Sequence, residues 1–209
     1  MKLCMFSPKD AGLERGWPGR IEGDHVIQLA AQTLQAYFSG GGTAREHAGF
    51  RLDEVVLRAP VLHPPSVRIF GPGDADFRFA NPAAIVGPDD VVRLPAGAGE
   101  IVPVPRVAAV IGADGEIGGY TLMIDWHAPS LAGAKAHDFA ISLGPVVVTP
   151  DEAGTPISPG MVELAGQNTR LLPGDVIAAG AIERDPVSAG AIVEFTDFNV
   201  GTLRNTVTR

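Results

Sequence analysis

The chain has 209 residues, of which 45% are hydrophobic and 19% are charged, with a formal net charge of −8 and a pI of about 5.0. This length allows one large domain or two small ones, and the mean hydropathy of +0.17 excludes an extensively disordered chain. The basic residues are scattered and outnumbered by acidic ones, which argues against nucleic acid or an anionic membrane as a partner.

Cysteine and lysine are both scarce. The single cysteine, Cys4, excludes an intrachain disulfide framework and a cysteine-built zinc site. The apolar stretch at the N-terminus is too short for a signal peptide, and no segment has the apolar length of a transmembrane helix. We therefore expect a cytoplasmic protein. Thirteen of the 16 basic residues are arginines, and Lys135 is the only lysine after residue 9.

Residues 1–58 have the pattern of a small, β-rich N-terminal unit. Apolar residues at helical spacing predict one helix in this unit, which Gly40, Gly41 and Gly42 end. Short apolar runs around a Gly-Asp turn predict strands. The predicted elements are strands within 3–6, 19–29 and 55–57 and a helix over 29–38.

Residues 59–209 have the pattern of a large, mostly β domain of the α+β class. The proline-rich stretch 59–72 is predicted to be an extended linker, because X-Pro steps favour extended geometry. Beyond residue 79, short apolar runs recur between Gly, Pro and Asp turns, with no long amphipathic helix between them. Strands are predicted at 85–86, 91–94, 107–111, 119–124, 146–149, 176–179 and 192–195.

Five phrases follow one another in this second part, at 107–112, 119–126, 135–139, 172–180 and 201–207. Their order and spacing resemble the fumarylacetoacetate hydrolase family. That family shows E-x-E before an apolar VVIG, then GYTxxND, K-x-F-D, PGD followed by TGTP, and a terminal G-x-LxN-x-V. Residues 60–67 resemble the family's PVxxPSK stretch, and the likeness extends more loosely over 1–58.

The resemblance implies a mixed β-roll core behind a small N-terminal unit, in a homodimer. Members of this family hold Mg²⁺ or a similar ion through several carboxylates. They hydrolyse, decarboxylate or isomerise β-diketo acids and related 2-oxo acids, and the ion stabilises enolate charge. The expected partner of this chain is therefore a small carboxylate or diketone.

The phrases that carry the metal depart from the family pattern. Val104 and Arg106 stand where the E-x-E carboxylates would be, and neither side chain is a ligand for a hard cation. Asp125 retains the carboxylate of the ND pair. The family's N-Y-x-x-H segment is missing after Phe70, and Gly180 stands in the loop that replaces TGTP. We expect no metal cofactor, with Mg²⁺ possible only if other carboxylates substitute for the lost ligands.

Four residues remain as candidates for chemistry, besides Gly180 in the substrate loop. Lys135 keeps the family's substrate-binding lysine, and its alternative is a solvated surface lysine. Asp125 and His127, two positions apart on a strand, share a face and form a candidate acid–base pair. The alternative is a buried Asp125 satisfied by backbone donors and a loop His127. Arg106 is either a carboxylate clamp or an ion-pair partner of Asp125 in place of the metal.

The leading hypothesis is a divergent member of the family that acts on a small oxo-acid or β-diketone-like molecule without Mg²⁺. Its enolisation-linked chemistry would be C–C cleavage, isomerisation, decarboxylation or cyclisation. Arg106 and Lys135 would supply positive charge, and Asp125 with His127 would move the proton. The alternatives are a metal-dependent hydrolase that uses Asp74, Asp76 or Glu100 beside Asp125, and a pseudoenzyme that binds without turnover. His137, in an aromatic position of the family, is interpreted as a packing residue.

Overall fold

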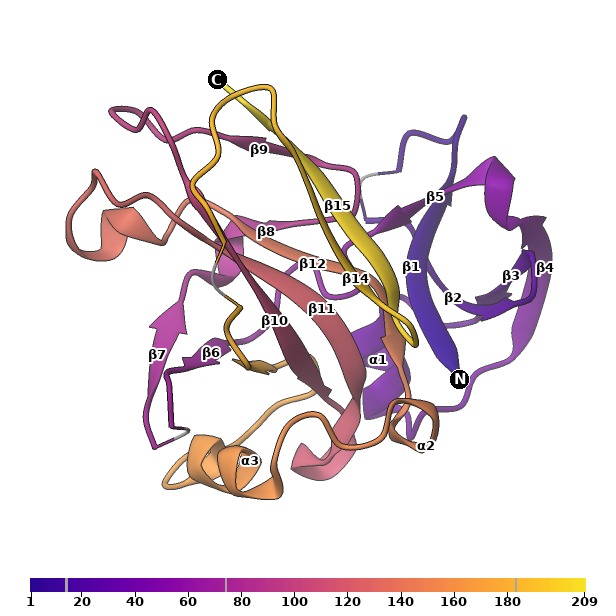
Figure 1. Cartoon of the computed structure of the whole chain (residues 1–209). Helices are drawn as coiled ribbons and strands as arrows, with labels where there is room; N and C mark the ends of the chain where they lie inside the picture. The colour runs from indigo at the N-terminus through magenta and orange to yellow at the C-terminus, as the bar shows by residue number, and fades with distance from the viewer. Residues whose placement is uncertain (14, 74, 183) are drawn as a thin grey trace.

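The computed structural model describes residues 1–13, 15–73, 75–182 and 184–209 (Figure 1). Most regular structure in these ranges is β. One twelve-stranded mixed sheet has the main order β4-β3-β2-β1-β12-β11-β10-β13-β6-β7, and a three-stranded sheet has the order β14-β15-β9. This architecture confirms the predicted α+β, mostly β fold class. No helix in the described ranges is long and apolar enough to cross a membrane.

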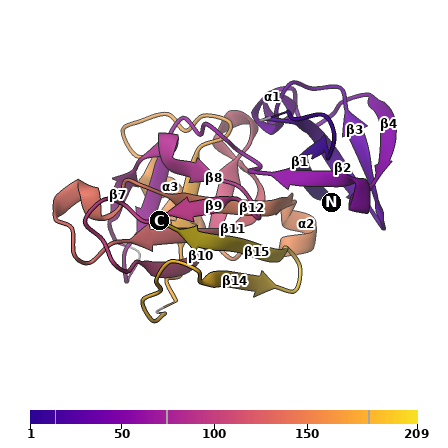
Figure 2. The ribbon, with the colours of Figure 1, turned by 90° about the horizontal axis from the view of Figure 1, so that it is seen from above.

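The N-terminal strands form a lobe at one side of the molecule, which Figure 2 shows at the right. Strand β1 pairs with β12, so this lobe is hydrogen-bonded into the large sheet. The predicted helix is wrong at its start, because Leu29 ends a strand and the Thr33 side chain caps the helix by accepting from the Ala36 N–H. The elements are β1 (Lys2–Pro8), β2 (Trp17–Glu22), β3 (His25–Leu29), α1 (Leu34–Ser39), β4 (Glu46–Arg51), η1 (Leu52–Glu54) and β5 (Val55–Arg58).

The centre of the sheet consists of three long antiparallel strands flanked by shorter ones. Segment 59–72 is more than a linker: it contains β6, whose four residues are all buried, between Pro65 and Pro72. Local proline content obscured this strand. The elements are β6 (Val67–Phe70), β7 (Phe77–Ala80), β8 (Ile85–Val86), β10 (Val102–Ile111), β11 (Ile117–His127), β12 (Ile141–Val148) and β13 (Val176–Ala179).

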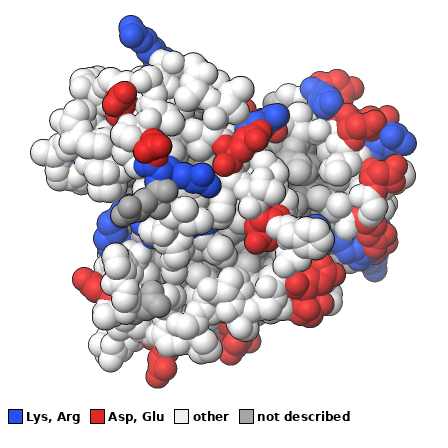
Figure 3. Space-filling model, viewed as in Figure 1, with Lys and Arg blue, Asp and Glu red and all other residues white. Residues whose placement is uncertain are grey.

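The small sheet and the remaining helices lie around this centre (Figure 1). The small sheet contains β9 (Val91–Arg93), β14 (Ile192–Asp197) and β15 (Gly201–Thr208). The α-helices are α2 (Pro150–Ala153) and α3 (Pro159–Gly166), and the 3₁₀ turns are η2 (Pro82–Ala84), η3 (Ala113–Gly115) and η4 (Gly133–Ala136). Figure 3 shows charged residues of both signs gathered over the N-terminal lobe, whereas broad parts of the remaining surface carry few charges.

The two faces of β11 contribute to different parts of the core. Leu122, Ile124 and Trp126 pack on one face, and the Trp126 Nε1–H donates to Ser142 Oγ at 2.8 Å. Met123 packs on the opposite face with Ala108 of β10. Because strand side chains alternate, Asp125 lies on the same face as Met123. The core thus determines which side of the sheet carries the acidic group.

Two polar residues of the family-like phrases act as structural ties. Asp175, in the PGD turn, accepts from Ser66 Oγ at 2.6 Å and from the Leu172 N–H at 2.8 Å. It also lies 3.6 Å from the buried Arg68 guanidinium. Asn205, in the terminal phrase, donates from Nδ2 to the carbonyls of Gly87 and Asp90. These contacts hold β6 against β13 and β15 against the turn after β8.

Candidate functional site

Three neighbouring parts of the large sheet bring charged side chains to one face. In the β10–β11 pair, Val104 lies opposite Asp125, and Arg106 follows two positions later on the same face. In the β6–β7 hairpin, Arg78 lies opposite Ile69, which packs in the same core cluster as Met123. The alternation of two strand pairs therefore directs Arg78, Arg106 and Asp125 to one place.

Asp125 is the centre of this cluster, and only 2% of the residue is exposed. Arg78 donates from Nη2 to both carboxylate oxygens at 2.7 Å. Arg106 approaches from the other side, with its Nε 3.4 Å from Oδ2, and its Nη1 donates to the Phe70 carbonyl at 3.2 Å. A buried carboxylate is stabilised by such charged donors. The backbone donors considered for Asp125 are therefore replaced by two guanidinium groups.

The cluster carries an excess of positive charge, because two arginines face one carboxylate. The Arg106 side chain is 11% exposed and the Arg78 side chain is 34% exposed. Burial lowers the pKa of Arg106, the Asp125 carboxylate opposes that shift, and the neighbouring Arg78 adds to it. Among the described contacts, the buried Arg106 Nε makes no hydrogen bond. Because this Nε lies 3.4 Å from Asp125 Oδ2, Arg106 acts on the carboxylate as an ion pair rather than through a hydrogen bond.

Two histidines stack beside this cluster. The rings of His127 and His137 lie 4.4 Å apart between centroids, at an interplanar angle of 8°. Desolvation lowers the pKa of His137, and the positive charge of Arg78 lowers it further. The imidazole of His137 is therefore neutral at pH 7 and free to accept a proton. Within the described contacts, no hydrogen bond joins Asp125 to His127, although both side chains share the expected face.

A pocket of about 380 Å³ opens next to these groups, between β7 and the segment around η4. Arg78 and His137 line it, and Asp138 and Asn81 form part of its wall. The Asn81 Nδ2 donates to the Asp138 carbonyl at 3.0 Å, which ties the two walls together. The pocket gives a small molecule access to the solvent-facing side of the Arg78 guanidinium.

Lys135 lies away from Asp125. Its side chain is 78% exposed and its Nζ forms an ion pair with Asp138 Oδ2 at 2.7 Å. Because Asp138 lines the pocket, Lys135 stands at the rim rather than in the cluster. The exposed Gly180 occupies a left-handed turn after β13, and the Ile182 N–H donates to the Pro105 carbonyl. The substrate loop expected at Gly180 therefore runs beside the residue that precedes Arg106.

Two groups of this site were not recognised in the sequence. Arg78 belongs to no family-like phrase, and its only signal is its position in an alternating Phe-Arg-Phe run after the shortened segment. His137 was interpreted as packing, whereas its ring both stacks on His127 and lines the pocket. Partners of a buried carboxylate that come from distant strands leave no local pattern.

The residues at this site do not fit a divalent cation. In the described parts of the chain, no three His, Cys, Asp or Glu residues are close enough to hold a metal ion. Asp76 accepts from the Phe77 N–H and Glu100 accepts from Ser188, so both exposed carboxylates are engaged in other contacts. Asp74 lies outside the described residues. The remaining carboxylate, Asp125, is flanked by two guanidinium groups that would repel a cation.

Solved structures resemble this chain over its whole length. Maleylpyruvate hydrolase from Sphingobium sp. SYK-6 superposes with a TM-score of 0.83 at 22% identity, covering 100% of this chain and 99% of that one. A 2-hydroxyhepta-2,4-diene-1,7-dioate isomerase from Mycobacterium marinum reaches 0.79 at 26% identity, with 100% and 98% covered. A 5-carboxymethyl-2-hydroxymuconate delta-isomerase from Mycobacterium smegmatis reaches 0.78 at 25% identity, with both chains fully covered.

No family model matches the sequence, and no curated protein matches it. The likeness is therefore carried by the fold and by the five phrases, which lie on β10, β11, the η4 segment, β13 and β15. The structural neighbours are enzymes of one family. This chain has the fold of that family, the fumarylacetoacetate hydrolases.

Proposed function

We propose that the chain is an enzyme that acts on a small oxo-acid or β-diketone-like substrate, with guanidinium groups in place of a divalent ion. The observation that carries the proposal is the cluster of Arg78 and Arg106 around Asp125 beside a pocket. Two permanent charges supply there the positive potential that an enolate needs.

Two structural neighbours support the substrate class. One crystal structure of maleylpyruvate hydrolase contains manganese(II) and pyruvate. The 2-keto-3-deoxy-D-arabinonate dehydratase, at 18% identity and a TM-score of 0.80, was solved with magnesium and 2,5-dioxopentanoate. Both small molecules carry a carboxylate next to an oxo group. Since the donor set around Asp125 does not fit a cation, we assign recognition of the same groups to arginine.

In the proposed reaction, Arg78 binds the substrate carboxylate or the enolate oxygen from the pocket side. Its planar fork suits two parallel hydrogen bonds to such oxygens. Arg106 lies deeper and adds positive charge in a preorganised, low-dielectric environment. Asp125 holds both guanidinium groups in place and is thus a positioning residue.

In this proposal, His137 is the general base. Its imidazole lines the pocket, and its lowered pKa keeps it unprotonated at pH 7. It would take the proton from the carbon next to the oxo group, while the electron pair of that C–H bond forms the enolate. His127 fixes the plane of the His137 ring by stacking. Lys135 acts at the rim, through Asp138.

The proposal is tested with oxalate, a planar dianion that resembles the enolate of pyruvate, in buffer containing EDTA. We expect oxalate to bind by isothermal titration calorimetry, and Arg78→Met to weaken binding by about 10-fold, the loss of one charged hydrogen-bonding group. Arg93→Met, at an exposed arginine of the small sheet, is the matched control and leaves binding unchanged. Lys135→Met tests the rim position, where a small effect is expected.

Turnover is measured on a panel of acylpyruvates and oxaloacetate, with and without EDTA. We expect activity to survive the chelator and Arg78→Met to reduce kcat/KM by about 10². Activity that disappears in EDTA and returns with Mg²⁺ would overturn the arginine assignment and favour the metal-dependent hydrolase.

A second candidate, a binding protein without turnover, is favoured by one specific observation. Both oxygens of Asp125 accept hydrogen bonds from Arg78, so the carboxylate that was expected to move the proton is engaged in an ion pair. Oxalate binding in EDTA without turnover of any panel member would select this candidate. The expected homodimer stays a prediction, checked by light scattering on the purified protein.

A further inference from the structure

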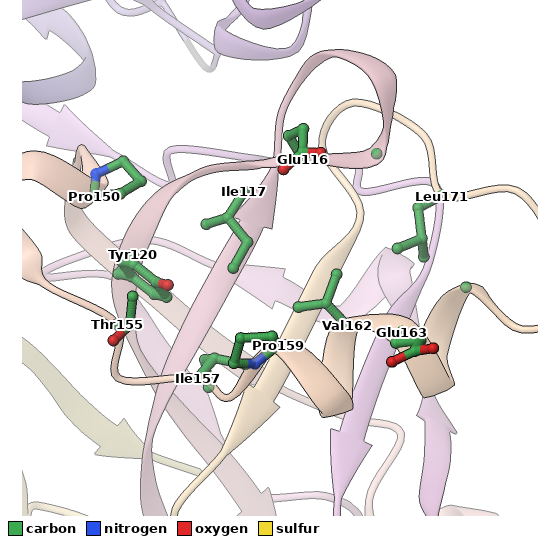
Figure 4. Close-up of a pocket in the computed structure, with 12 residues that line it drawn as sticks. Glu116, Ile117, Tyr120, Pro150, Thr155, Ile157, Pro159, Val162, Glu163 and Leu171 are labelled. Atoms are coloured by element: carbon green, nitrogen blue, oxygen red, sulfur yellow. The ribbon is translucent and has the colours of Figure 1, made fainter.

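We propose that a second pocket, at the opposite end of β11, binds a small ammonium compound with an apolar body, such as an arylalkylammonium or alkylammonium ion. The pocket has a volume of about 590 Å³. Its walls come from the start of β11, the segment around Ile157 and helix α3 (Figure 4). This volume is within the range of small-molecule sites, about 300–1,000 Å³.

The pocket is separate from the cluster at Asp125. Tyr120 lines the pocket and lies five residues before Asp125 on the same strand. At about 3.3 Å per residue the two are about 16 Å apart along β11, and their odd separation directs them to opposite faces. The core clusters agree, since Tyr120 packs with Ile111 and Ile177 rather than with Met123. The inference is therefore independent of the proposed function.

Tyr120 provides the polar group inside the pocket. The residue is 1% exposed, and among the described contacts its hydroxyl makes no hydrogen bond. Burial raises the pKa of Tyr120, so the hydroxyl stays neutral and can both donate and accept. The hydroxyl is not one of the fully buried polar atoms, so it keeps contact with solvent in the pocket and a polar group of a ligand can take the place of water there. The ligand therefore needs a polar atom at the Tyr120 end.

The negative charge at the mouth of the pocket favours a positively charged ligand. Glu116 and Glu163 line the pocket from opposite sides, the first before β11 and the second on α3 (Figure 4). No described salt bridge engages either glutamate, and no lysine or arginine is among the lining residues. Two exposed carboxylates without an ion-pair partner attract a cation and repel an anion.

The walls between the glutamates are apolar. Ile117, Ile157 and Val162 face one another across the pocket, and Leu171 closes one side (Figure 4). An aromatic ring or a short alkyl chain would bury against them, at about 25 cal/mol per Å² of apolar area. The combination of apolar walls, the Tyr120 hydroxyl and two carboxylates at the mouth fits an amine with a hydrophobic body better than a sugar or a carboxylic acid.

The test compares three probes of one skeleton: 2-phenylethylammonium, 2-phenylethanol and 3-phenylpropionate. Binding is followed by NMR of ¹³C-labelled isoleucine, leucine and valine methyl groups in the full chain. We expect the ammonium probe to shift Ile117, Ile157 and Val162 and to bind at least 10-fold more tightly than the carboxylate. Equal binding of the anion, or shifts confined to residues near Arg78, would overturn the inference.

Variants separate binding from folding. Glu163→Gln, at an exposed position, is expected to weaken binding of the ammonium probe by about 3-fold to 10-fold. The matched control Glu194→Gln, on β14, is expected to leave this affinity unchanged. Tyr120→Phe is expected to weaken binding without lowering the Tm, because the hydroxyl has no protein partner. A lower Tm for Tyr120→Phe, or unchanged affinity in both pocket variants, would contradict the assignment.

Discussion

The ion-pair cluster at Asp125 leads to a quantitative prediction for the variant Asp125→Asn. The substitution removes the negative charge and keeps the shape of the side chain. It leaves Arg106, whose side chain is 11% exposed, without its counter-charge. At the observed 3.4 Å and an effective dielectric constant of about 20, the lost attraction is about 5 kcal/mol.

Part of this attraction is offset in the native protein, so the measured loss is smaller. Removing one partner of a buried pair typically costs about 3–5 kcal/mol, because the other charge stays buried. Arg78 is 34% exposed and can turn toward water, so its contribution is discounted. We therefore expect Asp125→Asn to reduce the free energy of unfolding by about 3 kcal/mol, which lowers the Tm by about 6–12 °C for a chain of this size.

The assay is urea denaturation followed by circular dichroism, with scanning calorimetry as a second measurement. Asp89→Asn is the matched control, since the exposed Asp89–Arg204 pair has a similar short contact but little expected effect on stability. Adding Arg106→Met to Asp125→Asn is expected to recover stability, because it removes the uncompensated charge. A loss below about 1 kcal/mol for Asp125→Asn, or further destabilisation by the second change, would refute this reasoning.

Three further predictions concern the structural ties and buried groups. Asp175→Ala removes the acceptor of Ser66 and the counter-charge of buried Arg68, so the free energy of unfolding measured in urea should fall by about 3–5 kcal/mol. A loss below about 1 kcal/mol, as at exposed ion pairs, would contradict the structural role of Asp175. Burial raises the pKa of Cys4 to about 12, so thiol reagents should label it only at the rate of unfolding; rapid labelling in native buffer would disprove this. His137, facing Arg78, Arg106, His127 and Asp125, has a lowered pKa, so the native state binds a proton less readily than the unfolded chain. The stability that depends on a neutral His137 should be fully present above pH 6.5 and should be lost as the pH falls below it. His137→Gln should flatten this pH dependence in Tm measurements from pH 5 to 8.

Local sequence patterns were sufficient to predict most strands, because the alternation of apolar residues and the turn residues are features of a few neighbouring positions. They were insufficient where neighbouring signals competed. Residues 29–33 carry apolar spacing suited to a helix, yet Leu29 completes β3 and the helix begins only after Thr33. The prolines around β6 suggested a linker, although all four of its residues pair with β7 and three of them pair with β13. In both cases pairing with distant segments decided the outcome.

The candidate site divides in the same way. The five phrases predicted a fumarylacetoacetate hydrolase-like fold, and the position of Arg106 just before the first phrase made it a candidate ion-pair partner of Asp125. The register of β10 and β11 then places the two side chains on one face. Only the tertiary structure brought Arg78, 47 positions away in sequence, onto Asp125, and directed Lys135 to the rim. Ion pairs between distant strands and the direction of a side chain on a 3₁₀ turn depend on how whole elements pack. No spacing rule within the sequence carries that information.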